Sequence, residues 1–166
     1  MRFDLSKSFP LLTHRQFFVR GIFLELMWML RGQTDNKILE DQKVFIWSPW
    51  NGIIHKDKPT EMGQIYGALW RNFGARDLDH ITRPYTTEFL ELKGFDQIEY
   101  LLKEIKTNPT SSRLILTGWD PHISTQTPKE AVLPCCHMTF QFFIENGKLS
   151  GQLYQRSSDI SLARWF

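Results

Sequence analysis

The chain has 166 residues, of which 42% are hydrophobic and 14% aromatic, and its formal net charge is +2. This composition is enough for the core of one domain and excludes an intrinsically disordered chain. The charge is too weak to indicate DNA binding by itself, although it permits a local basic pocket for an anion. The sequence has no apolar stretch long enough for a membrane span and no spacing typical of metal ligands, so neither is predicted.

The N-terminal half is predicted to be mostly helical. Apolar residues recur at helical spacing over residues 14–31, and Arg31-Gly32 supplies a last-turn cation and a C-cap. The other predictions for this half are a short helix over 34–41, an extended or strand segment over 43–47, a loop over 48–63 and no defined element over 75–93.

The C-terminal half is predicted to combine one amphipathic helix with strands, which favours an α+β or mixed α/β domain. An apolar stripe predicts a helix over 95–106, and Asn108-Pro109 ends it. Asn146-Gly147 between two apolar runs is a strong signal for a β-hairpin. The elements predicted after the helix are a strand over 113–119, a loop over 120–130 and hairpin strands over 137–145 and 148–156.

Two adjacent cysteines bear on both compartment and chemistry. The Cα atoms of Cys135 and Cys136 are about 3.8 Å apart, closer than disulfide geometry usually allows, so free thiols and a reducing, cytoplasmic compartment are predicted. Cys136, which precedes His137, is a candidate nucleophile if a nearby cation lowers the pKa of its thiol. The alternative, which the residue types alone favour, is that both cysteines are small core residues.

Two arginines and a group of apolar residues are candidate binding groups. Arg113 and Arg156 lie at the ends of predicted strands, where guanidinium groups suit a phosphate, and Ser157 adds a hydroxyl beside Arg156. Taken singly, each arginine is more simply an ordinary surface or ion-paired residue. Three residues at the edge of a loop suit stacking against a flat heteroaromatic ring, with core packing as the favoured alternative: Ile46, Trp47 and Trp50.

Three further polar residues have two interpretations each. Glu25 lies in an apolar helix, where a carboxylate suits either a proton relay through water or a salt bridge with Arg20 or His137. Tyr66 either donates a hydrogen bond or packs. Asp159 either accepts a hydrogen bond from a ring nitrogen or caps the next element. From spacing alone, these residues reach no further than a candidate nucleotide site.

A series of motifs in chain order resembles the thymidylate synthase family. The most specific is the run Gln152 to Ser157 (QLYQRS), which follows Asn146 to Leu149 (NGKL). Residues 136–142 (CHMTFQF) resemble the strand that carries the family's nucleophile. The remaining matches are residues 1–11 before the first long helix, 25–32 (ELMWMLRG), 46–47 (IW) and 66–71 (YGALWR). The resemblance covers essentially the whole chain.

The resemblance implies a fold and a reaction. The fold would be a single α/β domain over residues 1–166, layered around a twisted mixed β-sheet that forms a back-to-back homodimer, and incomplete at both termini. The reaction would transfer a one-carbon unit from 5,10-methylenetetrahydrofolate, a co-substrate, to C5 of dUMP, with no metal.

The resemblance also implies roles for individual residues. Cys136 would add to C6 of dUMP. Glu25 would order water for proton transfers, and Tyr66 is a further catalytic candidate. Arg156 and Ser157 would hold the phosphate, Arg156 would help keep the thiol ionised, and Arg113 would reach the phosphate of the other subunit. The other implied contacts are Gln155, Ser158, Asp159 and His137 with the nucleotide, and Ile46, Trp47, Trp50, Leu133 and Asp159 with the folate.

Departures from the family pattern leave alternatives open. Cys135 stands where the family usually has Pro, Ser112 where it has a second Arg, and Asp120 where it has Asn. An arginine-bearing phosphate loop would precede Met1. The residue that distinguishes dUMP from dCMP would follow Phe166. A dUMP or dCMP hydroxymethylase, a partner to a complementing C-terminal chain, and a non-catalytic dimerising or binding module therefore stand beside the methyltransferase.

Overall fold

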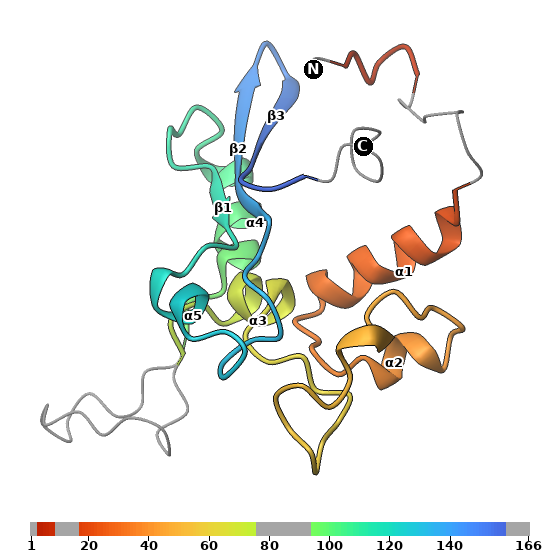
Figure 1. Ribbon diagram of the computed structural model, residues 1–166. Coiled ribbons are helices and arrows are strands. Elements are labelled where there is room, and N and C mark those ends of the chain that lie inside the picture. Colours follow the sequence, from red (N-terminus) through yellow and green to blue (C-terminus); the bar gives the residue numbers. More distant parts are fainter. Residues whose placement is uncertain (1–2, 9–16, 76–93, 159–166) are drawn as a thin grey trace, which may run out of the picture.

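The computed structural model describes residues 3–8, 17–75 and 94–158 (Figure 1). The named elements of the N-terminal half are all helical, and a small sheet follows them. The elements are helices α1 (Val19–Leu30) and α2 (Lys37–Glu40), the 3-10 helix η1 (Ser48–Trp50), helices α3 (Tyr66–Arg71) and α4 (Gln97–Thr107), strand β1 (Ile115–Thr117), helix α5 (Pro121–Thr125), and strands β2 (His137–Glu145) and β3 (Lys148–Gln155).

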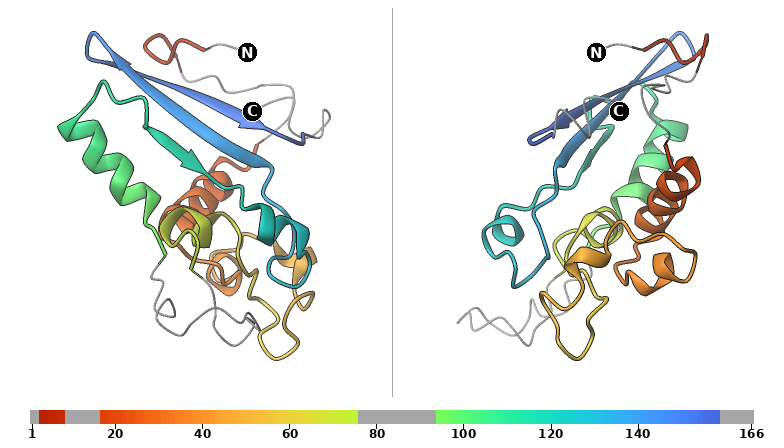
Figure 2. Two further views of the ribbon diagram at one scale, coloured as in Figure 1. Left: turned by 90° about the vertical axis from the view of Figure 1, so that its left-hand side faces the viewer. Right: turned by 45° about the vertical axis from the view of Figure 1, so that its right-hand side comes forward.

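The sheet of the described residues has the order β1-β2-β3, and both pairings are antiparallel. Asn146 and Gly147 have positive φ angles of 50° and 69°, which close the β2–β3 hairpin in the backbone conformation such a turn requires. Helices α3 and α4 contact β1, so the helices gather on one side of the sheet (Figure 2). Helices layered on a sheet agree with the expected α/β fold, although no parallel pairing occurs among the described strands.

The core lies where α1, α3 and the loop after α2 meet the inner face of the sheet. Trp28, Leu39, Met62, Ile65 and Leu114 are each less than 2% exposed. Long apolar side chains from four separate segments thus exclude water from one contiguous cluster, which is the main stabilising term expected for a domain of this size. No helix of the described residues is long and apolar enough to cross a membrane.

Several predicted elements are confirmed with adjusted ends. Helix α1 lies inside the predicted 14–31, of which 14–16 fall outside the described residues, and α2 lies inside 34–41. Helix α4 starts at Gln97 because the Asp96 carboxylate accepts a hydrogen bond from the Glu99 amide at 2.9 Å, an N-cap. Strand β1 is shorter than predicted, and β3 ends one residue before Arg156.

Two local predictions are wrong, and one helix was missed. Residues 43–47 form a turn rather than a strand, because Lys43 adopts a φ of 63° and the Val44 amide bonds back to the Leu39 carbonyl. The predicted loop 120–130 contains helix α5, which Asp120 caps and Pro121 opens. Helix α3 was not predicted at all; Gly67 lies within it, where a Cβ would meet the Gln33 carbonyl oxygen at 2.3 Å.

Candidate active site

Strands β2 and β3 bring the start of the motif at residues 136–142 next to the end of the motif at residues 152–157. His137 pairs with Gln155 in the antiparallel register, so the residues just outside the ladder, Cys136 and Arg156, are also opposite each other. The Arg156 amide donates to the Cys136 carbonyl at 3.0 Å, which extends the pairing by one residue. The sheet therefore fixes the separation of the candidate nucleophile and the candidate cation.

The Arg156 guanidinium faces the Cys136 thiol. Its Nη2 atom lies 3.7 Å from Cys136 Sγ and 2.7 Å from the Pro134 carbonyl oxygen, while Nε donates to the Cys135 carbonyl at 3.0 Å. The guanidinium carbon lies 5.3 Å from the ring centre of Trp119. The structure thus places a positively charged group beside the candidate nucleophile.

Tyr66, at the start of α3, supports the backbone of the nucleophile. Its hydroxyl oxygen accepts hydrogen bonds from the amides of Cys136 at 2.8 Å and His137 at 3.2 Å. The sequence left donation or packing open for Tyr66; the structure shows it packed in the core at 5% exposed and accepting hydrogen bonds from the chain. Burial raises the pKa of Tyr66 well above its usual range, so the phenol stays protonated, and burial lowers the pKa of His137, whose ring lies 5.5 Å from that of Tyr66.

The two cysteines occupy different environments. Cys135 is 3% exposed and belongs to the core, whereas Cys136 is only partly buried. Burial is the main cause that raises the pKa of the Cys135 thiol to about 12; an electrostatic contribution from the neighbouring Cys136 adds to the shift and Arg156 opposes it. Cys135 fits the interpretation of a buried core residue, and Cys136 fits that of a reactive thiol.

Glu25 and Trp47 form a second polar contact, between α1 and the loop after α2. The Trp47 Nε1–H donates to Glu25 Oε1 at 2.7 Å. Burial raises the pKa of Glu25, and this hydrogen bond partly opposes the rise. Among the described residues Glu25 has no ion pair, so the expected salt bridge with Arg20 or His137 is wrong; Arg20 Nη1 instead donates to the Gln42 carbonyl at 2.8 Å.

The candidate ring-stacking residues are only partly exposed. Trp47 is buried at 5%, with its ring 5.8 Å from Trp28 and 5.7 Å from Trp50, whereas Ile46 is 48% exposed. Trp47 therefore fits the core-packing interpretation, whereas the side chains of Ile46 and Trp50 remain at least partly exposed to solvent. Leu133 is partly buried and packs against the core.

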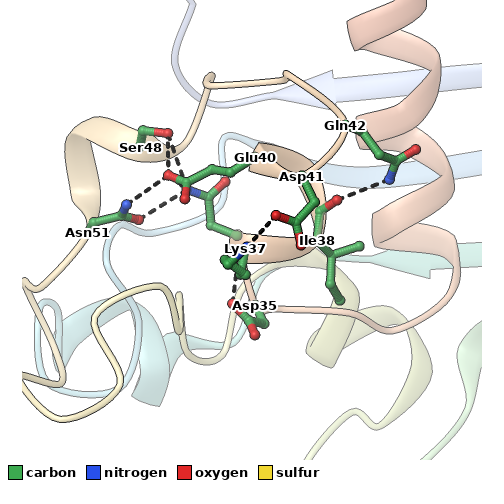
Figure 3. A network of polar contacts seen from close by, with 9 residues as sticks. Asp35, Lys37, Ile38, Glu40, Asp41, Gln42, Ser48 and Asn51 are labelled. Atoms are coloured by element: carbon green, nitrogen blue, oxygen red, sulfur yellow. Dashed lines mark hydrogen bonds and ion pairs between the residues drawn. The ribbon is translucent and has the colours of Figure 1, made fainter.

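A polar network that sequence reasoning missed anchors η1, which ends at Trp50. Figure 3 shows the Glu40 carboxylate turned toward Ser48 and Asn51, which donate to Oε1 at 2.6 and 2.9 Å. Asn36, fully buried, donates to the same oxygen at 3.1 Å. The two hydrogen bonds from Ser48 and Asn51 hold the pKa of Glu40 below its usual range. The network joins residues up to 15 positions apart in the chain, so no local sequence pattern predicts it.

Other predicted site residues lie apart from Cys136 or outside the described residues. Ile115 pairs with Gln141, which puts Arg113 toward the hairpin end of β2, roughly 20 Å along the strand from Cys136 at about 3.3 Å per residue. Ser157 and Ser158 follow Arg156 and are exposed, and the Gln155 side chain donates to the Ser157 carbonyl at 2.9 Å. Asp159 lies outside the described residues.

Comparison with known proteins agrees with the assembled motifs. A family model described as thymidylate synthase matches residues 1–166. The chain belongs to the thymidylate synthase family. It is 41% identical, over 98% of its length, to proteins named bifunctional dihydrofolate reductase-thymidylate synthase from Zea mays and from Paramecium tetraurelia. The matches cover 30% and 34% of those relatives, so the chain spans about a third of the length of the curated thymidylate synthase relatives that it matches.

Proposed function

We propose that this chain provides the nucleophile and part of the phosphate site of an enzyme that transfers a one-carbon unit from 5,10-methylenetetrahydrofolate to C5 of dUMP. The observation that carries the proposal is the Arg156 guanidinium 3.7 Å from Cys136 Sγ, in a chain of the thymidylate synthase family. Two relatives with thymidylate synthase in their names match 98% of the chain, which supports the same reaction.

Cys136 would start the reaction by attacking the pyrimidine ring. The electron pair of the thiolate forms the Sγ–C6 bond, and the C5–C6 π electrons move to C5 and on to the O4 carbonyl, which makes C5 nucleophilic. Arg156 supports this step because its positive charge at Sγ stabilises the thiolate before attack. Tyr66 supports it by fixing the amides of Cys136 and His137.

The phosphate of dUMP would be held by the same arginine and its neighbours. Among the described residues, Arg156 uses Nε and Nη2 for protein contacts and makes no hydrogen bond with Nη1, which leaves donors for an anion. Ser157 and Ser158 add exposed hydroxyl groups directly after it. Gln155, His137 and Asp159 remain candidate contacts with the nucleotide, as the resemblance implies.

The folate would bind against the loop beside Glu25. Ile46 and Trp50 offer apolar and aromatic surface suited to a flat pterin, with Trp47 behind them and Leu133 and Asp159 as further candidate contacts. When bound, methylenetetrahydrofolate supplies the one-carbon unit and then the hydride. Glu25 would hold or pass a proton through water, and its raised pKa suits that role.

The proposed assembly is a homodimer through the outer face of the sheet, in a reducing compartment such as the cytoplasm. Ile115, Phe143 and Tyr154 are 40, 47 and 62% exposed. The strand register puts all three on the face of the sheet opposite to the core. An apolar group at the centre of a sheet face suits contact with a second copy, and Arg113 would then reach the partner's phosphate site.

Product analysis tests the proposed reaction. The purified chain, incubated with dUMP and methylenetetrahydrofolate, is expected to convert dUMP to dTMP, identified by mass spectrometry of the nucleotides. A hydroxymethylated product would contradict the methyltransferase reaction while retaining the Cys136 chemistry. Unchanged dUMP with a folded chain would contradict catalysis by this chain.

A further inference from the structure

Hydrogen bonds fix the backbone on both sides of Trp119. Its amide donates to Thr117 Oγ1 at 3.1 Å, and the Gly118 amide donates to the Met138 carbonyl on β2 at 2.8 Å. The residue that follows, Asp120, caps α5. These contacts fix the backbone of Trp119, which lies between β1 and α5 in the chain.

The Arg156 guanidinium carbon lies over the indole ring of Trp119. The 5.3 Å separation from the Trp119 ring centre falls within the range of about 6 Å in which a cation is attracted to an aromatic face, and Trp is the strongest such partner. The edge of the same guanidinium is bonded to the Cys135 and Pro134 carbonyls. The guanidinium thus has three neighbours that position it, two carbonyl oxygens and one aromatic ring.

The contact with the Trp119 ring bears on the orientation of the Arg156 guanidinium. Arginine has a long, flexible side chain, and Arg156 as a whole is exposed, so two carbonyl contacts leave rotations of its plane open. A ring over the guanidinium would restrict rotation of the guanidinium plane. It would keep Nη2, which already bonds to the Pro134 carbonyl, directed at Cys136 Sγ.

We propose that Trp119 is a positioning residue for the nucleophile, and that its indole holds the Arg156 guanidinium in the orientation in which Nη2 reaches Cys136 Sγ. This inference rests on the proposed function, in which Cys136 attacks as a thiolate. It adds a residue that acts through Arg156.

Among the described residues, Arg156 is the cation that contacts the Cys136 thiol, with Nη2 3.7 Å from Sγ. The other described titratable groups around Cys136 are Tyr66, which bonds to its amide, and its chain neighbours Cys135 and His137. Burial raises the pKa of Tyr66 and of Cys135 and lowers the pKa of His137, so all three are neutral near pH 7. A change in the thiol's pH profile on substitution of Trp119 therefore reports the placement of Arg156.

The test is the rate at which iodoacetamide alkylates Cys136 in the full chain, followed by peptide mass spectrometry between about pH 5 and pH 10. Trp119→Leu removes the ring but keeps an apolar side chain, and Trp119→Phe keeps a smaller aromatic face. We expect Trp119→Leu to slow alkylation at about pH 7 roughly threefold and to move the profile to higher pH, with Trp119→Phe in between. Arg156→Gln marks the effect of losing the cation altogether.

A matched control separates this effect from a general loss of aromatic packing. The ring of Tyr100, on α4, lies 5.5 Å from the ring of Phe95 at a tilt of 53°, and Tyr100→Leu is expected to leave the profile unchanged. A Trp119→Leu profile that coincides with that of the unsubstituted chain overturns the proposal. If circular dichroism shows that Trp119→Leu does not fold, Trp119→Phe decides in the same way. The assay needs no nucleotide, so its outcome is independent of whether dUMP is converted.

Discussion

The Nη2 atom of Arg156 lies 3.7 Å from the Sγ atom of Cys136, 20 positions earlier in the chain. The β2–β3 register produces this contact, since it continues one residue beyond the pair His137 and Gln155. Two sequence motifs that are separate in the chain thereby form one site, in which a fixed cation faces a partly buried thiol. The predictions below test what holds that site together and what it does.

Tyr66→Phe is expected to destabilise the fold near the nucleophile. The substitution removes one oxygen and leaves the amides of Cys136 and His137 without their acceptor. Because an unsatisfied buried donor costs about 1–3 kcal/mol, we expect the free energy of unfolding to fall by about 2 kcal/mol in urea denaturation. Tyr100→Phe is the control, because the Tyr100 hydroxyl, on α4, makes no hydrogen bond with any described residue and its loss should be nearly neutral. Equal stabilities for the two variants would contradict the acceptor role of Tyr66.

The two thiols are expected to differ sharply in reactivity. In the folded chain iodoacetamide should modify Cys136 and spare Cys135, and in denaturant it should modify both, as counted by mass spectrometry. The reason is that Cys135 is buried and its pKa is raised to about 12 from an ordinary 9.0. Equal modification of both thiols in the folded chain would contradict the structure.

The same raised pKa predicts alkaline destabilisation. A thiol whose pKa is higher in the folded than in the unfolded chain contributes stability below the unfolded pKa and loses it as pH rises toward the folded pKa. The free energy of unfolding should therefore fall above about pH 9, and Tyr66 adds to the fall in the same direction. Cys135→Ala is expected to flatten part of this fall. A free energy of unfolding that is unchanged between about pH 8 and pH 11 would contradict the prediction.

Glu25→Gln is expected to separate stability from catalysis. Burial raises the pKa of Glu25, so the unsubstituted chain loses stability as pH rises through that pKa, whereas Gln cannot ionise and still offers an oxygen to Trp47 Nε1. The variant should thus gain relative stability between about pH 4 and pH 7, measured by urea denaturation. Turnover of dUMP should fall by roughly 10²–10⁴-fold if Glu25 handles protons. A variant that is less stable at neutral pH, or fully active, would contradict this account.

Phe143→Glu is expected to break the proposed dimer. Phe143 is 47% exposed on the outer face of the sheet, and a carboxylate there would meet its own copy across a two-fold interface. Sedimentation velocity should show a dimer for the unsubstituted chain and a weakening of association by at least about tenfold for the variant. Leu102→Glu, at a 54% exposed position on α4, is the control and should remain dimeric. A monomeric unsubstituted chain would rule out the homodimer under those conditions.

Local signals predicted the hairpin well, because its turn and strands are adjacent in sequence. Asn146-Gly147 defines the turn, and the apolar run before it gave β2 its observed bounds. Helix α5 was missed although its signal was present: Asp120-Pro121 is an N-cap followed by a proline at the first helical turn. Both residues lie inside the segment 120–130 that was predicted to be a loop.

The residues of the candidate site could be predicted from the sequence, but the contacts between them could not. The motifs identified Cys136, Arg156, Tyr66 and Glu25, and the structure connects the first three. The acceptor role of Tyr66 spans 70 positions, and no local periodicity carries such a pairing. The indole of Trp119 against Arg156 depends in the same way on the register of three strands, so it emerged only from the structure.

The most direct test of the central claim is covalent trapping with fluoro-dUMP and methylenetetrahydrofolate, read by intact-mass and peptide mass spectrometry. The account predicts a stable adduct of nucleotide and folate on Cys136, lost in Cys136→Ser and in Arg156→Gln but retained in Cys135→Ala. A folded chain that forms no adduct, or one that forms it at Cys135, would contradict the assignment of Cys136 as the nucleophile activated by Arg156.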